Sequence, residues 1–303
     1  MNVLVLGGNG FIGSNLCTEL LRQNHNVRII DRSIKNFNKL YMKNVEFIEA
    51  DFVQTQNFRP YLDGIDVVFH LISTTIPSTS NEDKIFDIKT NVCPTIQLLD
   101  DIVSMGREIK TVFLSSGGTV YGNSSFDIIP EEHPLNPICS YGIQKMTIEK
   151  YLQLYNHEYG IDYSIIRLSN PYGKGQEGKK GQGVVPIFLK KIINEEVIHI
   201  WGDGSITRDY IHINDVVDAL CRLLHYYGQE KVFNLGSGKG HTLNEIIEEI
   251  SMVTKKKAFI KYLEPRSIDV KKNVLDTSKI KQELMWRPQV SLNEGIQNML
   301  TIE

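Results

Sequence analysis

The sequence predicts an α/β protein: a doubly wound parallel sheet followed by a smaller C-terminal α/β lobe. Short runs of Val, Ile, Leu and Phe recur along the N-terminal half, amphipathic helical patterns lie between them, and the composition changes after residue 170. Near-continuous apolar strands are typical of a sheet covered on both faces. Alternating strands and helices require crossover connections, which make the sheet parallel.

The apolar runs predicted as strands of the sheet are Val3–Leu6, Val27–Ile30, Val45–Ile48, Val67–Leu71, Thr111–Leu114 and Tyr163–Leu168. The helix after the first run has its apolar stripe at Ile12, Leu16 and Leu20. A longer helix carries apolar residues three or four positions apart throughout. They are Ile85, Ile88, Val92, Ile96, Leu99 and Val103.

The predicted boundary follows Asn170-Pro171-Tyr172-Gly173, with residues 1–170 as a nucleotide-binding domain and 171–303 as a substrate domain. Strands from about 211–237 are expected to return to the first domain. Residues 174–183 are rich in Gly and Lys and predict a loop, either a surface connector or a flap over an anionic ligand. The elements predicted beyond it are a helix near Val185–Ile193, a strand at Val197–Trp201, a helix at Asn214–Leu224, a strand at Val232–Leu235 and a helix from Leu243.

Composition excludes several classes of function. A chain of 303 residues with 41% hydrophobic residues and a formal net charge of −3 carries no nucleic-acid signal. No apolar stretch is long enough to predict a membrane span. The four cysteines show no paired spacing, which favours a reducing, cytoplasmic compartment. The eight histidines form no ligand-spaced cluster, so no metal is expected.

Gly7-Gly8-Asn9-Gly10-Phe11-Ile12-Gly13 lies between the first strand and the first helix. Gly7 suits a tight turn, Gly10 lets the backbone approach a pyrophosphate, and Gly13 lets the helix pack closely on the sheet. The helix N-terminus, at Phe11 and Ile12, adds backbone amides and the positive end of a dipole. This context of strand, glycines and helix predicts a Rossmann-like dinucleotide site.

Asp31 ends the second strand, where a carboxylate accepts both ribose hydroxyls of NAD and repels the 2′-phosphate of NADP. NAD is therefore the expected cofactor. Arg32 follows and can serve a phosphate or stack on adenine. Asp51-Phe52, after the third strand, is expected at the adenine edge, with a helix cap as the alternative for Asp51.

Tyr141 and Lys145 stand at i and i+4 on one predicted helix, so they share a face. A Tyr normally titrates with a pKa of about 10, and a neighbouring ammonium lowers that value. The pair therefore predicts a general base. Tyr227 and Lys231 have the same spacing, but Tyr227-Gly228 is typical of a helix end. The Tyr141 pair also follows an apolar strand that ends in the hydroxyls of Ser115-Ser116.

Together these motifs resemble the extended short-chain dehydrogenase/reductase family, and more narrowly its nucleotide-sugar 4-epimerases of the UDP-glucose/UDP-galactose type. The resemblance runs nearly end to end. Besides the glycine turn and the Tyr141/Lys145 pair, its motifs are His70-Leu71, Asn91, Ser115–Gly122, Asn170–Gly173, Trp201–Gly204, Arg208–His212, Arg266-x-x-Asp269, Asp276–Lys279 and Trp286–Pro288.

The resemblance implies a reaction and further site residues. Tyr141 would take the proton from the sugar 4-hydroxyl while tightly bound NAD takes the hydride from carbon 4, and Lys145 would hold the nicotinamide ribose. The 4-keto sugar would then turn over and receive the hydride on its other face. Further cofactor contacts implied are Leu71, Asn91, Ser115 and Pro171.

The UDP-sugar site is likewise implied by resemblance. Arg208 and Arg266 would clamp the diphosphate, since a guanidinium fork bonds two oxygens at once. Asp269 would accept a ribose hydroxyl or orient Arg266. The remaining substrate contacts implied are Asn170, Val185, Trp201, Tyr210 and Asn273. A smaller residue at Asn273 than the Tyr of related enzymes would admit N-acetylated sugars, the alternative being a surface Asn without a role.

The chain departs from the family pattern at Gly117, where related epimerases carry a catalytic Ser or Thr. Ser116 is the first candidate for the hydroxyl, Thr119 the second and a bridging water the third. The absence of an acid near Gly117-Gly118 disfavours dehydration. The alternatives are a 4-keto-sugar reductase, a UDP-glucuronate epimerase or decarboxylase, and a nucleotide-binding relative without catalysis.

A homodimer is also expected by resemblance, through the helix around Asn91 and the helix of Tyr141. Ile148, Leu152 and Tyr155 are candidates for that contact or, alternatively, for the core.

Overall fold

The computed structural model describes residues 1–33, 45–176, 183–265 and 270–300 of the chain. These residues form two compact units. Unit 1 comprises Met1–Gly122, Pro134–Arg167 and Ala219–Phe233. Unit 2 comprises Asn123–His133, Leu168–Asp218 and Asn234–Glu303. The chain therefore passes between the units more than once.

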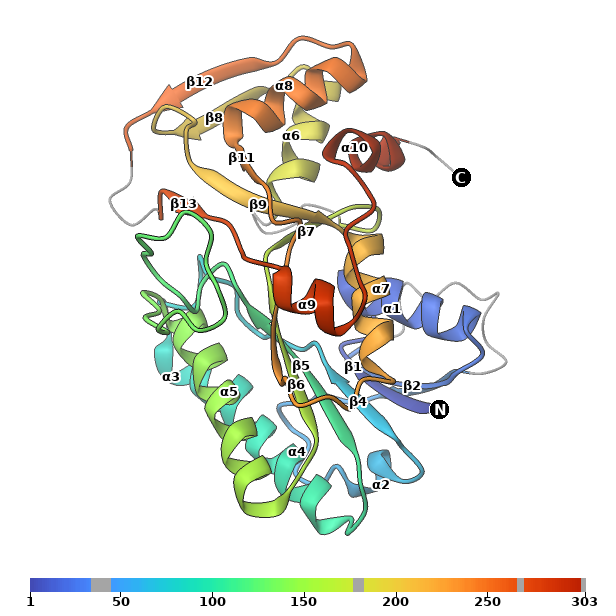
Figure 1. The fold of residues 1–303 in the computed structure, drawn as a ribbon. Helices are drawn as coiled ribbons and strands as arrows, with labels where there is room; N and C mark the ends of the chain where they lie inside the picture. The colour runs from blue at the N-terminus through green and yellow to red at the C-terminus, as the bar shows by residue number, and fades with distance from the viewer. Residues whose placement is uncertain (34–44, 177–182, 266–269, 301–303) are drawn as a thin grey trace. The chain divides into compact units, whose positions relative to one another are not determined.

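Unit 1 is built on a seven-stranded sheet in the order β10-β6-β5-β4-β1-β2-β3 (Figure 1). The strands from β3 to β5 in that order pair in parallel. The strand order reverses between β1 and β4, and open α/β sheets bind ligands at the carboxyl ends of strands beside such a reversal. The strands are β1 (Asn2–Leu6), β2 (Asn26–Asp31), β3 (Val45–Glu49), β4 (Val67–His70), β5 (Lys110–Ser116), β6 (Tyr163–Leu168) and β10 (Val232–Leu235).

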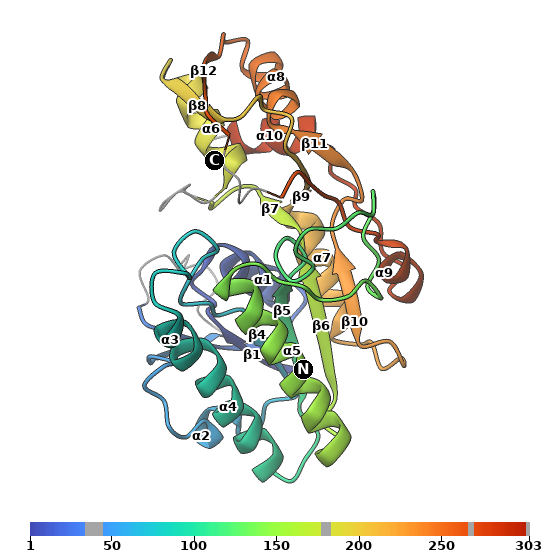
Figure 2. The ribbon, with the colours of Figure 1, turned by 90° about the vertical axis from the view of Figure 1, so that its left-hand side faces the viewer.

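Helices cover both faces of this sheet (Figures 1 and 2). Helix α1 and the C-terminal part of α7 lie on one face, and α4 and α5 lie on the other. The helical segments are α1 (Phe11–Arg22), α2 (Arg59–Leu62), α3 (Lys84–Asp87), the π-helical turn η2 (Ile88–Val92), α4 (Cys93–Ser104), α5 (Ser140–Tyr159) and α7 (Ile213–Leu223). The doubly wound parallel fold expected from the alternating pattern is confirmed.

The core between the sheet and helices α4 and α5 corrects one expectation. Ile148, Leu152 and Tyr155 belong to a buried cluster with Phe113 and Leu99. The prediction that these three residues contact a second copy of the chain is therefore wrong, and the alternative prediction, that they belong to the core, is confirmed. Their stripe on α5 faces the sheet because the helix packs against β5 and α4.

Unit 2 contains smaller sheets and its own core. Strand β9 pairs antiparallel with β11 and parallel with β13 and β7, and β12 pairs in parallel with β8. Helices α6, α8 and α10 pack together over an apolar cluster that includes Val185, Leu189 and Ile246. The strands are β7 (Asn170–Tyr172), β8 (Val197–Trp201), β9 (Thr207–His212), β11 (Gly240–Thr242), β12 (Phe259–Leu263) and β13 (Lys272–Asn273). The helices are α6 (Val184–Ile193), α8 (Leu243–Thr254), α9 (Ser278–Glu283) and α10 (Leu292–Leu300).

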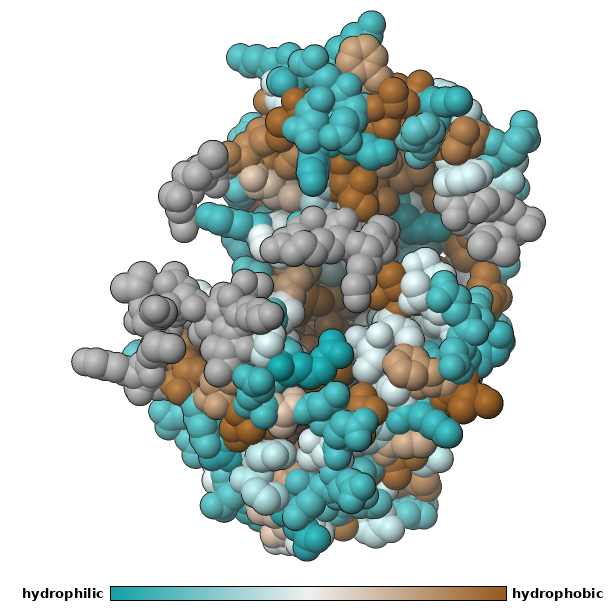
Figure 3. Space-filling model, turned by 180° about the vertical axis from the view of Figure 1, so that it is seen from behind, coloured by the Kyte–Doolittle hydropathy of each residue, from teal (hydrophilic) through white to brown (hydrophobic). Residues whose placement is uncertain are grey.

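The surface is mixed in character. Seen from behind, hydrophilic and hydrophobic residues are interspersed over the face of the molecule (Figure 3), as is usual because apolar atoms make up much of any protein surface. Within the described ranges, no helix combines the length and the apolar character needed to span a bilayer.

Candidate active site

The turn between β1 and α1 has the shape of a pyrophosphate cradle. Gly7 has φ +83°, which favours glycine, and a Cβ built on Gly13 would lie 2.2 Å from the Gly7 carbonyl oxygen. A side chain at Gly13 would therefore push the helix away from the turn, and one at Gly7 would strain the backbone and press on Ile72. Helix α1 starts after Gly10, with no side-chain cap among the described residues. The first amides of the helix, including those of Phe11 and Ile12, thus suit an anion.

Asp31 lies beside this turn. Its Oδ2 accepts a hydrogen bond from the Asn9 backbone N–H at 3.0 Å, and its Oδ1 accepts one from the Arg32 N–H at 2.7 Å. A carboxylate held at the end of β2 and tied to the glycine turn fits the ribose of a dinucleotide. The Arg32 side chain is exposed. These residues fit NAD, as the motif predicts.

The predicted adenine contacts are more limited. Asp51 Oδ1 accepts from the Val53 N–H at 2.9 Å and so holds a turn after β3. No helix of the described residues begins there, because α2 starts only at Arg59, so the helix-cap alternative for Asp51 is wrong. The Phe52 side chain is buried and packs against the rings of Phe58 and His70, with centroids 5.3 and 5.0 Å away. Phe52 can therefore offer only backbone atoms to a ligand.

Tyr141 and Lys145 lie side by side at the start of α5. The Lys145 Nζ is 5.7 Å from the centre of the Tyr141 ring and 4.7 Å from that of Phe113. It donates a hydrogen bond to the Leu114 carbonyl oxygen at 2.8 Å. Lys145 is thereby fixed near the carboxyl end of β5, with its side chain buried.

The electrostatics of the pair differ from the expectation. Burial raises the pKa of Tyr141 to about 12, against a smaller lowering by its hydrogen bond with the Ser73 side chain. Burial also lowers the pKa of Lys145 to about 7, although the carboxylates of Glu149 and Asp87 oppose this. The expected net lowering of the pKa of Tyr141 is thus wrong for the protein alone, because burial disfavours the phenolate more than the hydrogen bond with Ser73 favours it.

The hydroxyls that follow β5 have different surroundings. Ser115 is buried and donates to Glu149 Oε1 at 2.5 Å, so its side chain supports the loop from beneath. The Ser116 carbonyl accepts from the Thr119 N–H at 3.2 Å, which closes a turn around Gly117. Thr119 Oγ1 is buried and has no hydrogen-bond partner within the described part of the chain. A Cβ on Gly142 would lie 2.8 Å from the Thr119 carbonyl, so this loop packs directly on α5.

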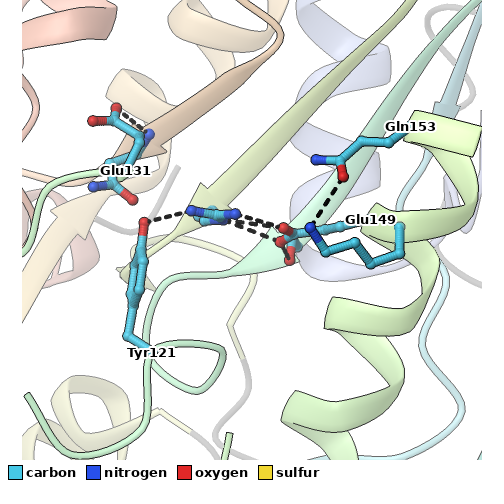
Figure 4. A network of polar contacts seen from close by, with 8 residues as sticks. Tyr121, Glu131, Glu149 and Gln153 are labelled. Atoms are coloured by element: carbon cyan, nitrogen blue, oxygen red, sulfur yellow. Dashed lines mark hydrogen bonds and ion pairs between the residues drawn. The ribbon is translucent and has the colours of Figure 1, made fainter. Parts of the chain in front are cut away.

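A buried ion pair beneath the loop was not predicted. The Arg167 guanidinium donates to Glu149 Oε2 at 2.7 Å and to the Tyr121 hydroxyl at 3.0 Å (Figure 4). Glu149 is fully buried and also accepts the Ser115 hydroxyl. The available signals were a Glu at i+4 from Lys145 and a single charged residue, Arg167, inside the buried strand β6.

Asn91 and the unpredicted Asp87 form a second buried polar group. The Asn91 amide donates to Thr74 Oγ1 at 2.7 Å and to Asp87 Oδ1 at 3.1 Å, and it accepts from the Thr74 N–H at 2.9 Å. Asn91 thus holds the segment after β4, to which the predicted contact Leu71 also belongs. Asn91 lies in the π-helical turn η2, a feature frequent at functional sites.

Most residues predicted to bind substrate lie in unit 2. Asn170 Nδ2 donates to the Asp209 carbonyl at 3.0 Å, with Pro171 next to it in β7. Arg208 pairs in register with Asn273 across β9 and β13. Asn273 is 1% exposed, which rules out the surface alternative. Arg266, Asp269 and most of the predicted loop at residues 174–183 lie outside the described residues.

The residues predicted to flank the base differ in exposure. Val185 and Tyr210 are buried in unit 2. Trp201 is 42% exposed and lines a cavity of about 780 Å³ together with Tyr262, Pro265 and Lys271. An aromatic wall of this kind suits a flat ring.

Comparison with known proteins identifies the class. The model of the NAD dependent epimerase/dehydratase family matches residues 3–236, and the chain belongs to that family. NAD is therefore its cofactor, and the chain is an enzyme of the epimerase and dehydratase type.

Individual relatives cover almost the whole chain. A putative UDP-glucose 4-epimerase of Methanocaldococcus jannaschii is 35% identical over 98% of this chain and 97% of its own. A dTDP-4-dehydro-6-deoxyglucose reductase of Escherichia coli is 36% identical over 98% of this chain and 96% of its own. The crystal structure of UDP-glucose 4-epimerase with UDP-glucose from Thermotoga maritima matches with a TM-score of 0.92 and 34% identity, over 99% and 97% of the two chains.

Proposed function

We propose that the protein interconverts the 4-epimers of a UDP-hexose through a 4-keto intermediate, with resident NAD. The observation that carries the proposal is the position of Tyr141 and Lys145. They lie side by side at the carboxyl end of β5, in the unit whose glycine turn fits the cofactor. The similarity to UDP-glucose 4-epimerases supports this assignment.

In this mechanism Tyr141 receives the proton of the sugar 4-hydroxyl and later returns it. Bound NAD supplies a hydride acceptor and a positively charged ring. Protonated Lys145 lies beside the Tyr141 ring and favours its phenolate form. The hydrogen bond with Ser73 also lowers the pKa of the phenol, against the burial that raises it. The Lys145 ammonium is held in position because it donates a hydrogen bond to the Leu114 carbonyl oxygen.

The carboxylates of unit 1 argue against elimination of a sugar hydroxyl. Glu149, which lies beneath the loop, is committed to Arg167 and Ser115. Asp87 is fully buried among the hydroxyls of Thr75 and Ser140. A dehydratase needs an acid that can protonate the leaving group, and Gly117 and Gly118 supply none.

For the substrate, we propose that unit 2 binds the UDP group through Asn170, Val185, Trp201, Arg208 and Tyr210. Arg266 and Asp269 keep the roles that the resemblance implies. The burial of Asn273 beside Arg208 supports a role in admitting N-acetylated hexoses.

A second candidate is a nucleotide-4-keto-sugar reductase, favoured by the similarity to the Escherichia coli enzyme. Against it stands Asp31, whose carboxylate at the glycine turn opposes the 2′-phosphate of the NADPH that such reductases usually prefer. A UDP-glucuronate epimerase or decarboxylase remains the third alternative.

We also propose a homodimer, with a contact surface different from the buried α5 stripe. Large apolar side chains on α3, η2 and α5 are exposed. They are Ile85 at 66%, Phe86 and Ile88 at 48% and Ile143 at 47%. Ile88→Lys is expected to shift the protein toward monomer in sedimentation velocity, and an unchanged sedimentation coefficient would place the contact elsewhere.

An NMR time course tests the reaction. Purified protein is incubated with UDP-glucose, UDP-N-acetylglucosamine or UDP-glucuronate without added cofactor, and formation of a 4-epimer supports the proposal. Oxidation to a released 4-keto sugar that requires added NAD⁺ or NADP⁺ would favour the reductase instead, acting in its reverse direction. Tyr141→Phe is expected to bind NAD and UDP-sugar but to lose turnover by about two to four orders of magnitude.

A further inference from the structure

The segment after β4 brings one more hydroxyl to Tyr141. The Leu71 N–H donates to the Leu6 carbonyl at 3.1 Å, and a Cβ on Gly7 would lie 3.1 Å from Ile72 Cγ1. The segment therefore passes along the glycine turn. The next residue, Ser73, hydrogen-bonds the Tyr141 phenol, an interaction that lowers its pKa. The Ser73 hydroxyl also donates to the Thr75 carbonyl at 3.0 Å.

One buried carboxylate fixes both sides of this contact. Asp87 Oδ1 accepts from Thr75 Oγ1 at 2.5 Å, in the segment that carries Ser73. Asp87 Oδ2 accepts from Ser140 Oγ at 2.7 Å, in the residue directly before Tyr141. Asp87 is 0% exposed, so separating Ser73 from Tyr141 would require breaking charge-assisted hydrogen bonds in the interior.

Asn91 and Thr90 hold the same segment from the π-helical turn. Asn91 Oδ1 accepts from the Thr74 N–H at 2.9 Å, and the Thr74 and Thr90 hydroxyl oxygens are 2.6 Å apart. A partly exposed loop residue such as Ser73 is thus held with the precision usual for core side chains. Preorganisation of this kind is expected where a hydrogen bond must strengthen during a reaction.

We propose that Ser73 is a further catalytic residue that stabilises the Tyr141 phenolate, and that Asp87 is a positioning residue that holds the two together. This inference rests on the proposed function, in which Tyr141 is the acid and base. It assigns to Ser73 a hydroxyl next to the reacting oxygen in a chain that has Gly117 where related enzymes carry one.

The proton inventory of the step balances. While Tyr141 is neutral, its O–H can donate to Ser73 Oγ, and the Ser73 proton goes to the Thr75 carbonyl. The reactive form is the phenolate, because Tyr141 can accept the sugar proton only after its own proton has passed to solvent. The Ser73 O–H then rotates from the Thr75 carbonyl to the phenolate oxygen, and no proton leaves Ser73.

The charged and titratable groups around the pair define the expected pH dependence. Burial is the main cause that raises the pKa of Tyr141, and the Cys139 and Asp87 side chains raise it further. Asp87 and Glu149 also raise the pKa of Lys145 against the larger effect of burial. Glu149 is itself paired with Arg167. His70, which faces Lys145, has its pKa lowered to about 3 by burial and then by Lys145, so it is neutral in the working range.

Ser73→Ala, Ser73→Thr and the matched control Thr79→Ala, an exposed hydroxyl in the same segment, test the role of Ser73. Ser73→Ala is expected to lower kcat/KM about ten- to a hundredfold, the scale of a hydrogen bond to a charged group. The acid limb of its pH profile of kcat/KM should move to higher pH, because the Tyr141 phenolate loses a hydrogen-bond donor. Ser73→Thr should restore much of the rate, and Thr79→Ala should match the wild type.

Asp87→Asn separates positioning from charge. Its side chain keeps the shape, and the Ser140 hydroxyl can turn to accept from the new amide. Loss of the negative charge favours both the phenolate and neutral Lys145, so both limbs of the pH profile should move to lower pH. That shift is opposite in sign to the acid-limb shift of Ser73→Ala.

A readout independent of turnover distinguishes failure of the inference from failure of the proposed function. The ¹³Cζ signal of Tyr141, assigned with Tyr141→Phe in NAD-loaded protein, should shift in Ser73→Ala and not in Thr79→Ala. If the wild type converts no UDP-hexose but the signal shifts, the contact stands and the proposed function fails. A wild-type rate and acid limb in Ser73→Ala, with the loss found instead in Ser116→Ala or Thr119→Ala, would overturn the inference. An unmoved ¹³Cζ signal would do so as well.

Discussion

Glu149→Gln is expected to destabilise unit 1 more than any other replacement of a single charge discussed above. Glu149 is 0% exposed and accepts hydrogen bonds from Arg167 Nη2 at 2.7 Å and from Ser115 Oγ at 2.5 Å. The amide of Gln has a similar shape but leaves the guanidinium of Arg167 buried without its counter-charge. Arg167 is 4% exposed, so solvent cannot replace the carboxylate.

The magnitude follows from this geometry. Removing one partner of a buried ion pair costs roughly 3–5 kcal/mol, because the other charge remains in a medium of low dielectric constant. For a chain of this length the apparent Tm should fall by about 5 °C or more. Arg167→Met removes the same pair from the other side. The double variant should therefore lose less than the sum of the two single variants.

Thermal unfolding followed by circular dichroism measures the effect. The control is Lys150→Gln, the same loss of one charge on the next residue of α5, where Lys150 is exposed and contacts Gln153 (Figure 4). The control should change the free energy of unfolding by less than about 0.5 kcal/mol. Equal Tm values for Glu149→Gln and Lys150→Gln would refute the reasoning.

Further variants test the cofactor and substrate sites. Gly13→Ala should yield protein without bound NAD, because its Cβ would lie 2.2 Å from the Gly7 carbonyl; an absorbance spectrum that still shows bound cofactor would contradict the cradle. Asp31→Ala should weaken NAD binding at least about tenfold in calorimetry, the scale of lost hydrogen bonds to a carboxylate, whereas an unchanged Kd would assign the ribose to another residue. Asn273→Tyr should lower turnover of N-acetylated UDP-hexoses relative to the non-acetylated pair, and an unchanged ratio in NMR assays would remove Asn273 from specificity.

The sequence was sufficient to predict those parts of the site that depend on residues a few positions apart in the chain. Glycines between a strand and a helix specify the cradle at Gly7 and Gly13, and a Tyr and a Lys at i and i+4 must share a helix face. The apolar runs likewise predict the sheet, because a strand covered on both faces needs such residues along its length.

The structure was needed where function depends on packing between distant segments. The sign of the pKa shift of Tyr141 is set by burial, which no spacing reveals. The contacts of Ser73 and Asp87 join a loop, a short helix and the start of α5, and their polar residues follow no period. The extra residue of the π-helical turn at Ile88–Val92 is also invisible to a pattern of three and four.

The central claim is that hydride leaves carbon 4 of a UDP-hexose and returns to the same carbon through resident NAD while Tyr141 moves the proton. UDP-hexose labelled with deuterium at carbon 4 tests it most directly, in ordinary water and without added cofactor. The account predicts a 4-epimer that retains the deuterium at carbon 4 in wild-type protein and almost no product in Tyr141→Phe. A 4-epimer that carries solvent hydrogen at carbon 4 would contradict it.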